Sequence, residues 1–121
     1  MLNHYRAQLA RGAFGAVVLI SFAVLFTPES GVPAAPPGTD KVVHFALFAA
    51  LAGTGLGARI RRVPLAAGLV CYAALSEVLQ GVLPLGRSGD VLDALVDVAG
   101  IAAGFAVVAA AARSALARQR G

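Results

Sequence analysis

Long uncharged apolar runs limit the fold of this chain more than any other feature of its sequence. Gly12 to Pro28 and Val42 to Ala58 are each 17 residues long and contain no acidic residue, lysine or arginine. At a rise of about 1.5 Å per residue, such a run is at the short end of what crosses a bilayer as a helix. Only 13% of the residues are charged, against about 25% in soluble domains. The sequence therefore predicts an integral membrane protein.

Two further apolar segments extend this prediction to an all-α bundle of four transmembrane helices. The predicted spans cover approximately residues 12–28, 42–58, 63–83 and 91–112. Four of the six prolines lie between residues 28 and 39, and Pro84 follows the third span. Because proline interrupts helical hydrogen bonding, these positions are loops or helix ends. The chain of 121 residues is predicted to form one domain, residues 1–121, with no room for a second.

The basic residues predict the orientation of this bundle. With four spans, eight of them fall on one side of the membrane and only Lys41 and Arg87 on the other. The positive-inside rule then places both termini in the cytoplasm and the chain in the cell membrane. The eight are Arg6, Arg11, Arg59, Arg61, Arg62, Arg113, Arg118 and Arg120.

A cleaved signal peptide is the alternative interpretation of the first span. Val32, Pro33 and Ala34 resemble a small-residue cleavage site that follows a basic segment and an apolar core. We favour a retained span, because the core is long and the site lies far beyond it. A mature N-terminus at Ala35 would show cleavage.

Local signals predict helix caps and close helix contacts. Thr39 or Asp40 is expected to cap the second helix, and Asp90 the fourth, because their side chains can accept bonds from free helical N–H groups. Two pairs of glycines with GxxxG spacing allow close helix approach, although the oligomeric state stays open. These pairs are Gly53 with Gly57 and Gly100 with Gly104. Cys71 lies in an apolar run and is expected to be an inert packing residue.

Every acidic residue falls in the outer half of the predicted bundle. Asp90, Asp93 and Asp97 share one helix face, since they are spaced i, i+3 and i+7. Close carboxylates at low dielectric do not all stay charged, so protons, a charged His44 or a bound cation must compensate them. Ionisable groups inside a membrane are expensive and mark functional sites by default. The six acids are Glu29, Asp40, Glu77, Asp90, Asp93 and Asp97.

Structural roles are the alternative for the same residues. Asp40 and Asp90 can serve only as caps, and Arg87 can be a surface residue of a loop. His44, Glu77, Gln80, Asp93 and Asp97 can hold helices together by hydrogen bonds. Ser76 and Tyr72 are expected to pack or to bond to their own helix rather than to react.

Recognisable catalytic or metal patterns are weak in this sequence. Ser76 or Ser88 with His44 and Asp93 would make a serine triad, but no nucleophile elbow is visible. A metal site from His44, Glu77, Asp93 and Asp97 has suitable ligand types without diagnostic spacing, so we predict no metal and no cofactor. The net charge of +4 does not indicate nucleic acid, because the basic residues flank apolar runs.

The polar residues resemble the motifs of the VanZ-like family. The resemblance covers roughly residues 40–104 and comprises D-K-x-x-H, E-x-x-Q and the later Pro, Arg, Asp and Gly positions. These are Asp40, Lys41, His44, Glu77, Gln80, Pro84, Arg87, Asp93 and Gly100. Asp97 departs from the pattern, which usually has Asn there, and this favours a bound proton or cation. The resemblance implies a multi-pass membrane protein of bacteria, of a family whose founding member is associated with teicoplanin resistance.

These observations predict a polar pocket at the outer membrane face that binds an amphiphilic envelope molecule. Candidate ligands are a lipid head group, a lipid-linked cell-wall precursor or a lipoglycopeptide, with Lys41, His44 and Arg87 facing anionic groups. Glu77, Gln80, Asp93 and Asp97 would orient the ligand, with Asp40 and Asp90 beside them. A membrane-embedded hydrolase or transferase using Glu77, His44 or Asp93 is the second hypothesis. A structural assembly subunit is the third.

Overall fold

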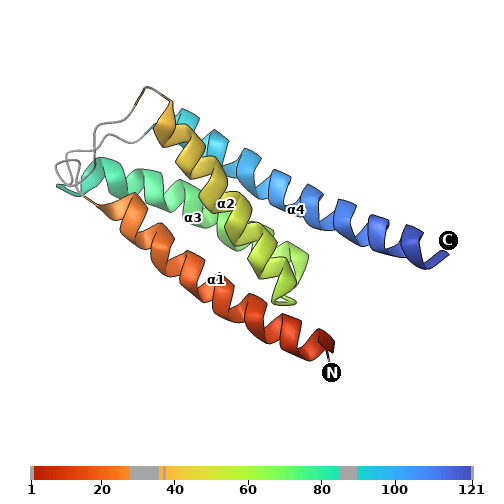
Figure 1. The fold of residues 1–121 in the computed structure, drawn as a ribbon. Coiled ribbons are helices and arrows are strands. Elements are labelled where there is room, and N and C mark those ends of the chain that lie inside the picture. Colours follow the sequence, from red (N-terminus) through yellow and green to blue (C-terminus); the bar gives the residue numbers. More distant parts are fainter. Residues whose placement is uncertain (1, 28–35, 37, 85–89, 121) are drawn as a thin grey trace.

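Four helices form an up-and-down bundle in the computed structural model, which describes residues 2–27, 36, 38–84 and 90–120. They are α1 (Leu2–Phe26), α2 (Thr39–Gly57), α3 (Arg62–Val82) and α4 (Val91–Arg120). The described part contains no strand, in agreement with the predicted all-α fold. Both termini lie at one end of the bundle, whereas the start of α2, the end of α3 and the start of α4 lie at the other (Figure 1).

Three of these helices, within the described residues, are long and apolar enough to cross a membrane: His4–Phe26, Arg62–Val82 and Val91–Arg120. Large apolar side chains such as Leu19, Val78 and Leu95 are exposed on them, which is unusual for a soluble protein. α2 is shorter, and its first two turns contain Asp40, Lys41 and His44. Like α3, it contacts all three other helices, and its most extensive contact is with α4. His44 is thus buried against protein, whereas Asp40 is exposed.

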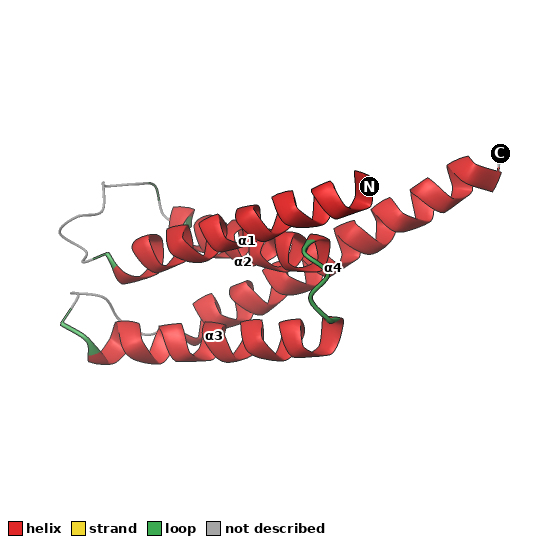
Figure 2. Cartoon of the chain, turned by 90° about the horizontal axis from the view of Figure 1, so that it is seen from below, coloured by secondary structure: helices red, strands yellow, loops and turns green. Residues whose placement is uncertain are grey.

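Helices α1 and α4 are longer than the predicted spans. α1 begins at Leu2 instead of residue 12, because residues 2–11 contain good helix formers and Gln8 donates a hydrogen bond to the His4 ring (3.2 Å). α4 continues to Arg120 instead of ending at residue 112, with Arg118 and Arg120 placed favourably for the helix dipole in its last turn. These last turns extend beyond the rest of the bundle (Figure 2).

The helix ends confirm one predicted cap and correct another. Asp90 caps α4, since its Oδ1 accepts a bond of 2.9 Å from the Leu92 N–H. Neither Thr39 nor Asp40 caps α2. The cap position is Gly38, whose φ of 88° is left-handed, and no side chain bonds to the free N–H groups there. The expectation was wrong because this glycine moves the helix start forward, so that Thr39 and Asp40 lie in the first turn.

The apolar core lies between α1, α2 and α3, with one contribution from α4. Phe48 and Leu51 of α2 are fully buried, together with Leu25 of α1. Tyr72 packs against Phe48, with ring centres 5.6 Å apart, as its packing role predicted. Cys71 was expected to pack inside, but it is exposed, because it lies on the outward face of α3.

Glycines bring α2 and α4 into close contact. A Cβ atom built on Gly100 would lie 2.4 Å from the backbone oxygen of Phe45, and one on Gly104 would lie 2.6 Å from that of Ala49. Neither position has space for a side chain. Gly53 differs, since a Cβ there would meet nothing within 4 Å, and Gly57 lies against Ala10 of α1 at 3.2 Å.

Replacing Gly100 by alanine is therefore expected to destabilise the bundle. The added methyl group must push α2 and α4 apart, and overpacking of this kind costs about 1–3 kcal/mol. The free energy of unfolding, measured by denaturant titration in mixed micelles, checks this. Gly53→Ala is the matched control and should not lower stability. Equal stability of the two variants would contradict the close contact.

Candidate functional site

Polar side chains from α2, α3 and α4 meet at the bundle end where α2 and α4 begin. His44, Asp93 and Asp97 are buried among them, together with Glu77 of α3. α2 and α4 run parallel here. Their paired residues are therefore separated by nearly the same number of positions in the sequence, 52 for Lys41 and Asp93 and 53 for His44 and Asp97. The close glycine contact, which starts at Gly100, holds these pairs together.

Asp97 and His44 form the deepest pair of the cluster. Asp97 is fully buried and His44 is 2% exposed, and the His44 Nδ1–H donates to Asp97 Oδ1 over 2.8 Å. Glu77 Oε1 lies 3.7 Å from the same ring nitrogen. The other nitrogen, Nε2, faces Asp40 Oδ1 at 3.6 Å. His44 is thus approached by carboxylates from all three helices.

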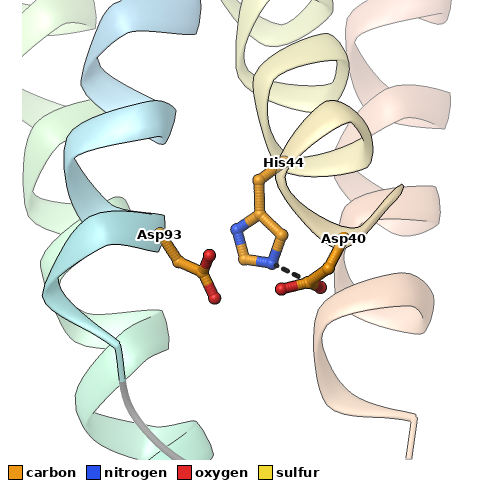
Figure 3. A group of neighbouring side chains, drawn as sticks. All are labelled: Asp40, His44 and Asp93. Atoms are coloured by element: carbon orange, nitrogen blue, oxygen red, sulfur yellow. Dashed lines mark ion pairs between the residues drawn. The ribbon is translucent and has the colours of Figure 1, made fainter. Parts of the chain in front are cut away.

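Figure 3 shows His44 with two of the neighbouring carboxylates, Asp40 and Asp93. The His44 ring lies between Asp40 of its own helix and Asp93 of α4. The carboxylate of Asp93 is, however, engaged elsewhere, because its Oδ1 accepts a hydrogen bond from Lys41 Nζ over 3.0 Å. Lys41 also reaches Asp90 Oδ2 at 3.3 Å, and its side chain is 39% exposed. The one lysine of the chain is therefore already neutralised by two aspartates.

The charges of Lys41 and Asp90 stabilise each other just outside the predicted spans. Hydrogen bonds to Asp93 and Asp90 raise the pKa of the Lys41 ammonium. The backbone N–H of Leu92, and then Lys41, lower the pKa of the Asp90 carboxyl. Both groups therefore stay charged over the whole physiological range.

Glu77 and Asp97 each have a buried oxygen without a hydrogen-bond partner in the described part of the protein. These atoms are Glu77 Oε1 and Asp97 Oδ2. The other oxygen of Glu77 accepts the backbone N–H of Asp90 over 3.1 Å, which fixes the side chain against the start of α4. Buried carboxylate oxygens without a partner are costly. A hydrogen-bond donor or a cation would therefore stabilise these two oxygens.

An open groove of about 530 Å³ lies between α3 and α4 beside this cluster. Its walls are small or apolar, and Glu77 and Asp90 are its only polar lining residues among those described. The lining consists of Ala74, Glu77, Val78, Gly81, Asp90, Val91 and Ala94. The volume is in the usual range for small-molecule sites.

The sequence reasoning missed the apolar part of this groove. Ala74, Val78 and Gly81 stand three residues before, one after and four after Glu77, which places them on one helical face with it. Small residues beside a buried acid on one face are the signal that could have found them. The signal was missed because single alanine, valine and glycine residues are not distinctive in a sequence that is rich in alanine and glycine throughout.

The remaining predicted residues lie apart from the cluster or outside the described residues. Gln80 turns toward α1, where its Nε2 donates to the backbone oxygen of Leu25 over 2.7 Å. Ser76 bonds to the carbonyl of Ala73 in its own helix, in agreement with its predicted structural role. Arg87, Ser88 and Glu29 lie outside the described residues.

Gln80 has a measurable anchoring role in this arrangement. The Leu25 carbonyl is in the last turn of α1, where helical partners run out, so Gln80→Met leaves a buried acceptor unpaired. We expect a loss of about 1–3 kcal/mol in the free energy of unfolding. Gln8→Met, which removes an exposed amide of α1, is the control and should stay within about 0.5 kcal/mol of wild type. Equal losses in both variants would refute the anchor.

Comparison with known proteins agrees with the motif resemblance. The sequence model of the VanZ/LLP1 family matches residues 6–112, a range that includes α2, α3 and most of α1 and α4. Searches among curated proteins and among solved structures find no match. The family match covers the acidic cluster and the helices that build it. The chain therefore belongs to the VanZ/LLP1 family.

Proposed function

We propose that this protein is a four-span bacterial cell-membrane protein that binds an amphiphilic envelope molecule at its outer face. The observation that carries the proposal is the groove between α3 and α4, whose described lining is small or apolar apart from Glu77 and Asp90. An acyl or polyprenyl chain fits such walls. A head group bearing hydroxyl or amine donors fits the two carboxylates.

The proposed orientation has both termini in the cytoplasm and the acidic cluster on the outer side. The basic residues of the α2–α3 turn and of the two terminal regions support it, since all of them then face the cytoplasm. In this proposal α2 also crosses the membrane, which makes four spans in all. His44 is buried against the other helices and Lys41 is paired with Asp90 and Asp93, which lowers the cost of placing these first turns of α2 in a membrane.

Lys41 has a different role here from the one its charge first suggested. Because Asp90 and Asp93 already neutralise it, it holds α2 to the start of α4 rather than meeting an anionic ligand. The ligand-facing groups are instead acceptors. A lipid-linked cell-wall precursor or a lipoglycopeptide antibiotic carries the sugar hydroxyls and amines that acceptors bind, and capture of either would change glycopeptide susceptibility.

The topology can be tested with reporter fusions. A reporter fluorescent only in the cytoplasm and a phosphatase active only outside are each fused after Arg120 or to a chain ended after Pro84. We expect fluorescence and no phosphatase activity for the first position, and the opposite for the second. Identical behaviour at the two positions would contradict a membrane crossing by α4, and the reversed pattern would contradict three spans before Pro84 with the N-terminus in the cytoplasm.

The binding proposal can be tested with two polyprenyl lipids that differ only in the head group. We expect the purified protein in nanodiscs to bind a polyprenyl diphosphate carrying a disaccharide more tightly than polyprenyl phosphate. Glu77→Gln removes one charged acceptor and should weaken that preference about 10-fold, since a hydrogen bond to a charged group contributes about 1.5–3 kcal/mol.

The apolar part of the groove needs its own variants. Ala74→Leu and Ala94→Leu should fill the groove and weaken binding of both lipids. Ala102→Leu adds the same volume to an exposed position of α4 outside the groove lining and serves as the control. Equal affinity of all three variants for both lipids, in folded protein, would refute the groove as the binding site.

A further inference from the structure

We propose that His44, Glu77 and Asp97 bind one divalent transition-metal ion, for which Zn²⁺ has the best-matched chemistry. The three side chains are buried, and one ligand atom from each lies within 4.8 Å of the others. The site is deeper than the groove described above, and only Glu77 belongs to both. The inference therefore does not depend on the proposed lipid ligand.

The unpartnered oxygens are the first reason to infer an ion. Among the described residues, Glu77 Oε1 and Asp97 Oδ2 have no hydrogen-bond partner, and their residues are only 7% and 0% exposed. Both side chains converge on the same nitrogen, His44 Nδ1. Two carboxylates beside a neutral imidazole leave two negative charges, which a dication neutralises. Lys41 cannot do this, because Asp90 and Asp93 engage it.

The geometry is close to that of a small metal site. In tetrahedral coordination with ligand bonds of about 2.0–2.2 Å, neighbouring ligand atoms lie roughly 3.3–3.6 Å apart. Here Nδ1 lies 2.8 Å from Asp97 Oδ1 and 3.7 Å from Glu77 Oε1. The ion would take the place of the proton that His44 Nδ1 now donates to Asp97, and the separation of Nδ1 and Asp97 Oδ1 would then lengthen by roughly half an ångström.

A carboxylate faces the far side of the imidazole, at a distance slightly longer than a hydrogen bond. Metal-binding histidines donate their second N–H to a carboxylate or carbonyl, which fixes the ring. His44 Nε2 faces Asp40 Oδ1 at 3.6 Å, as Figure 3 shows. One nitrogen and two carboxylates suit Zn²⁺ or Mn²⁺, whereas Ca²⁺ takes six to eight oxygens. Three protein ligands leave one position of a tetrahedral ion open.

A second grouping, Asp40, His44 and Asp93, is a competing arrangement. It uses the opposite nitrogen of His44, and Asp40 is exposed. Asp93 Oδ1 already accepts from Lys41. The charge of Asp93 is therefore balanced by Lys41, and that of Asp40 is exposed to the surroundings. A cation would stabilise this grouping less than it would stabilise Glu77 and Asp97.

The test uses the full-length, tag-free protein in nanodiscs, first stripped with a chelator. Zn²⁺ titration should show one site per chain, and Co²⁺ should give the visible absorption of a tetrahedral complex. The chain has two histidines. In His4→Ala, X-ray absorption of the Co²⁺ complex should therefore still show one imidazole ligand, which must then be His44. This measurement needs no change at the site, so poor folding of a ligand variant cannot obscure it.

Ligand variants then locate the ion. Asp97→Asn and Glu77→Gln should each weaken Zn²⁺ binding at least about 10-fold, the lower end of what even supporting residues contribute. Asp93→Asn should retain binding. An unmodified protein that binds neither Zn²⁺ nor Co²⁺ would overturn the inference, and so would full affinity in the Asp97 and Glu77 variants. Loss of binding only in Asp93→Asn would move the ion to the competing arrangement. Lipid affinities of Ala74→Leu, measured separately, report on the groove alone.

Discussion

The close contact of α2 with α4 is the constraint on which the rest of the structure depends. Gly100 and Gly104 let α4 lie against the backbone of α2, and a side chain at either position would collide with it. This contact sets the two parallel helices in a fixed register. Lys41 then meets Asp93, and His44 meets Asp97. Without it, the charged groups of the two helices would face an apolar environment unpaired.

The third helix turns this pair of helices into a site. Glu77 fixes the start of α4 by accepting the Asp90 N–H, so a helix-capping group and a site residue share one contact. The same carboxylate borders the α3–α4 groove and approaches His44 with its other oxygen. Glu77 thereby links a surface where an amphiphile can lie to a buried centre that needs positive charge. Gln80, one turn further along α3, serves the bundle by binding the end of α1.

The sequence predicted the parts of this arrangement that follow from local rules. Pro84 and Asp90 marked helix ends because proline and capping residues act locally, and the spacing of Asp93 and Asp97 placed them on one face. The sequence did not predict features that depend on the local backbone conformation or on packing between helices. Gly38 took the cap position expected of Thr39 or Asp40, and the orientation of α3 exposed Cys71. Which carboxylate neutralises Lys41, and which oxygens stay unpaired, depends on helix register, and no single segment encodes it.

An experimental structure of the protein, purified in its native lipid and determined by cryo-electron microscopy, tests most directly whether the acidic cluster is a ligand site. Elongated density along Ala74, Val78 and Ala94 that ends at Glu77 is the predicted result. Compact density within bonding distance of Glu77, Asp97 and His44 would add the ion. A groove filled by the protein's own side chains, with every oxygen of Glu77 and Asp97 bonded to protein groups, would contradict it and leave the cluster a purely structural joint.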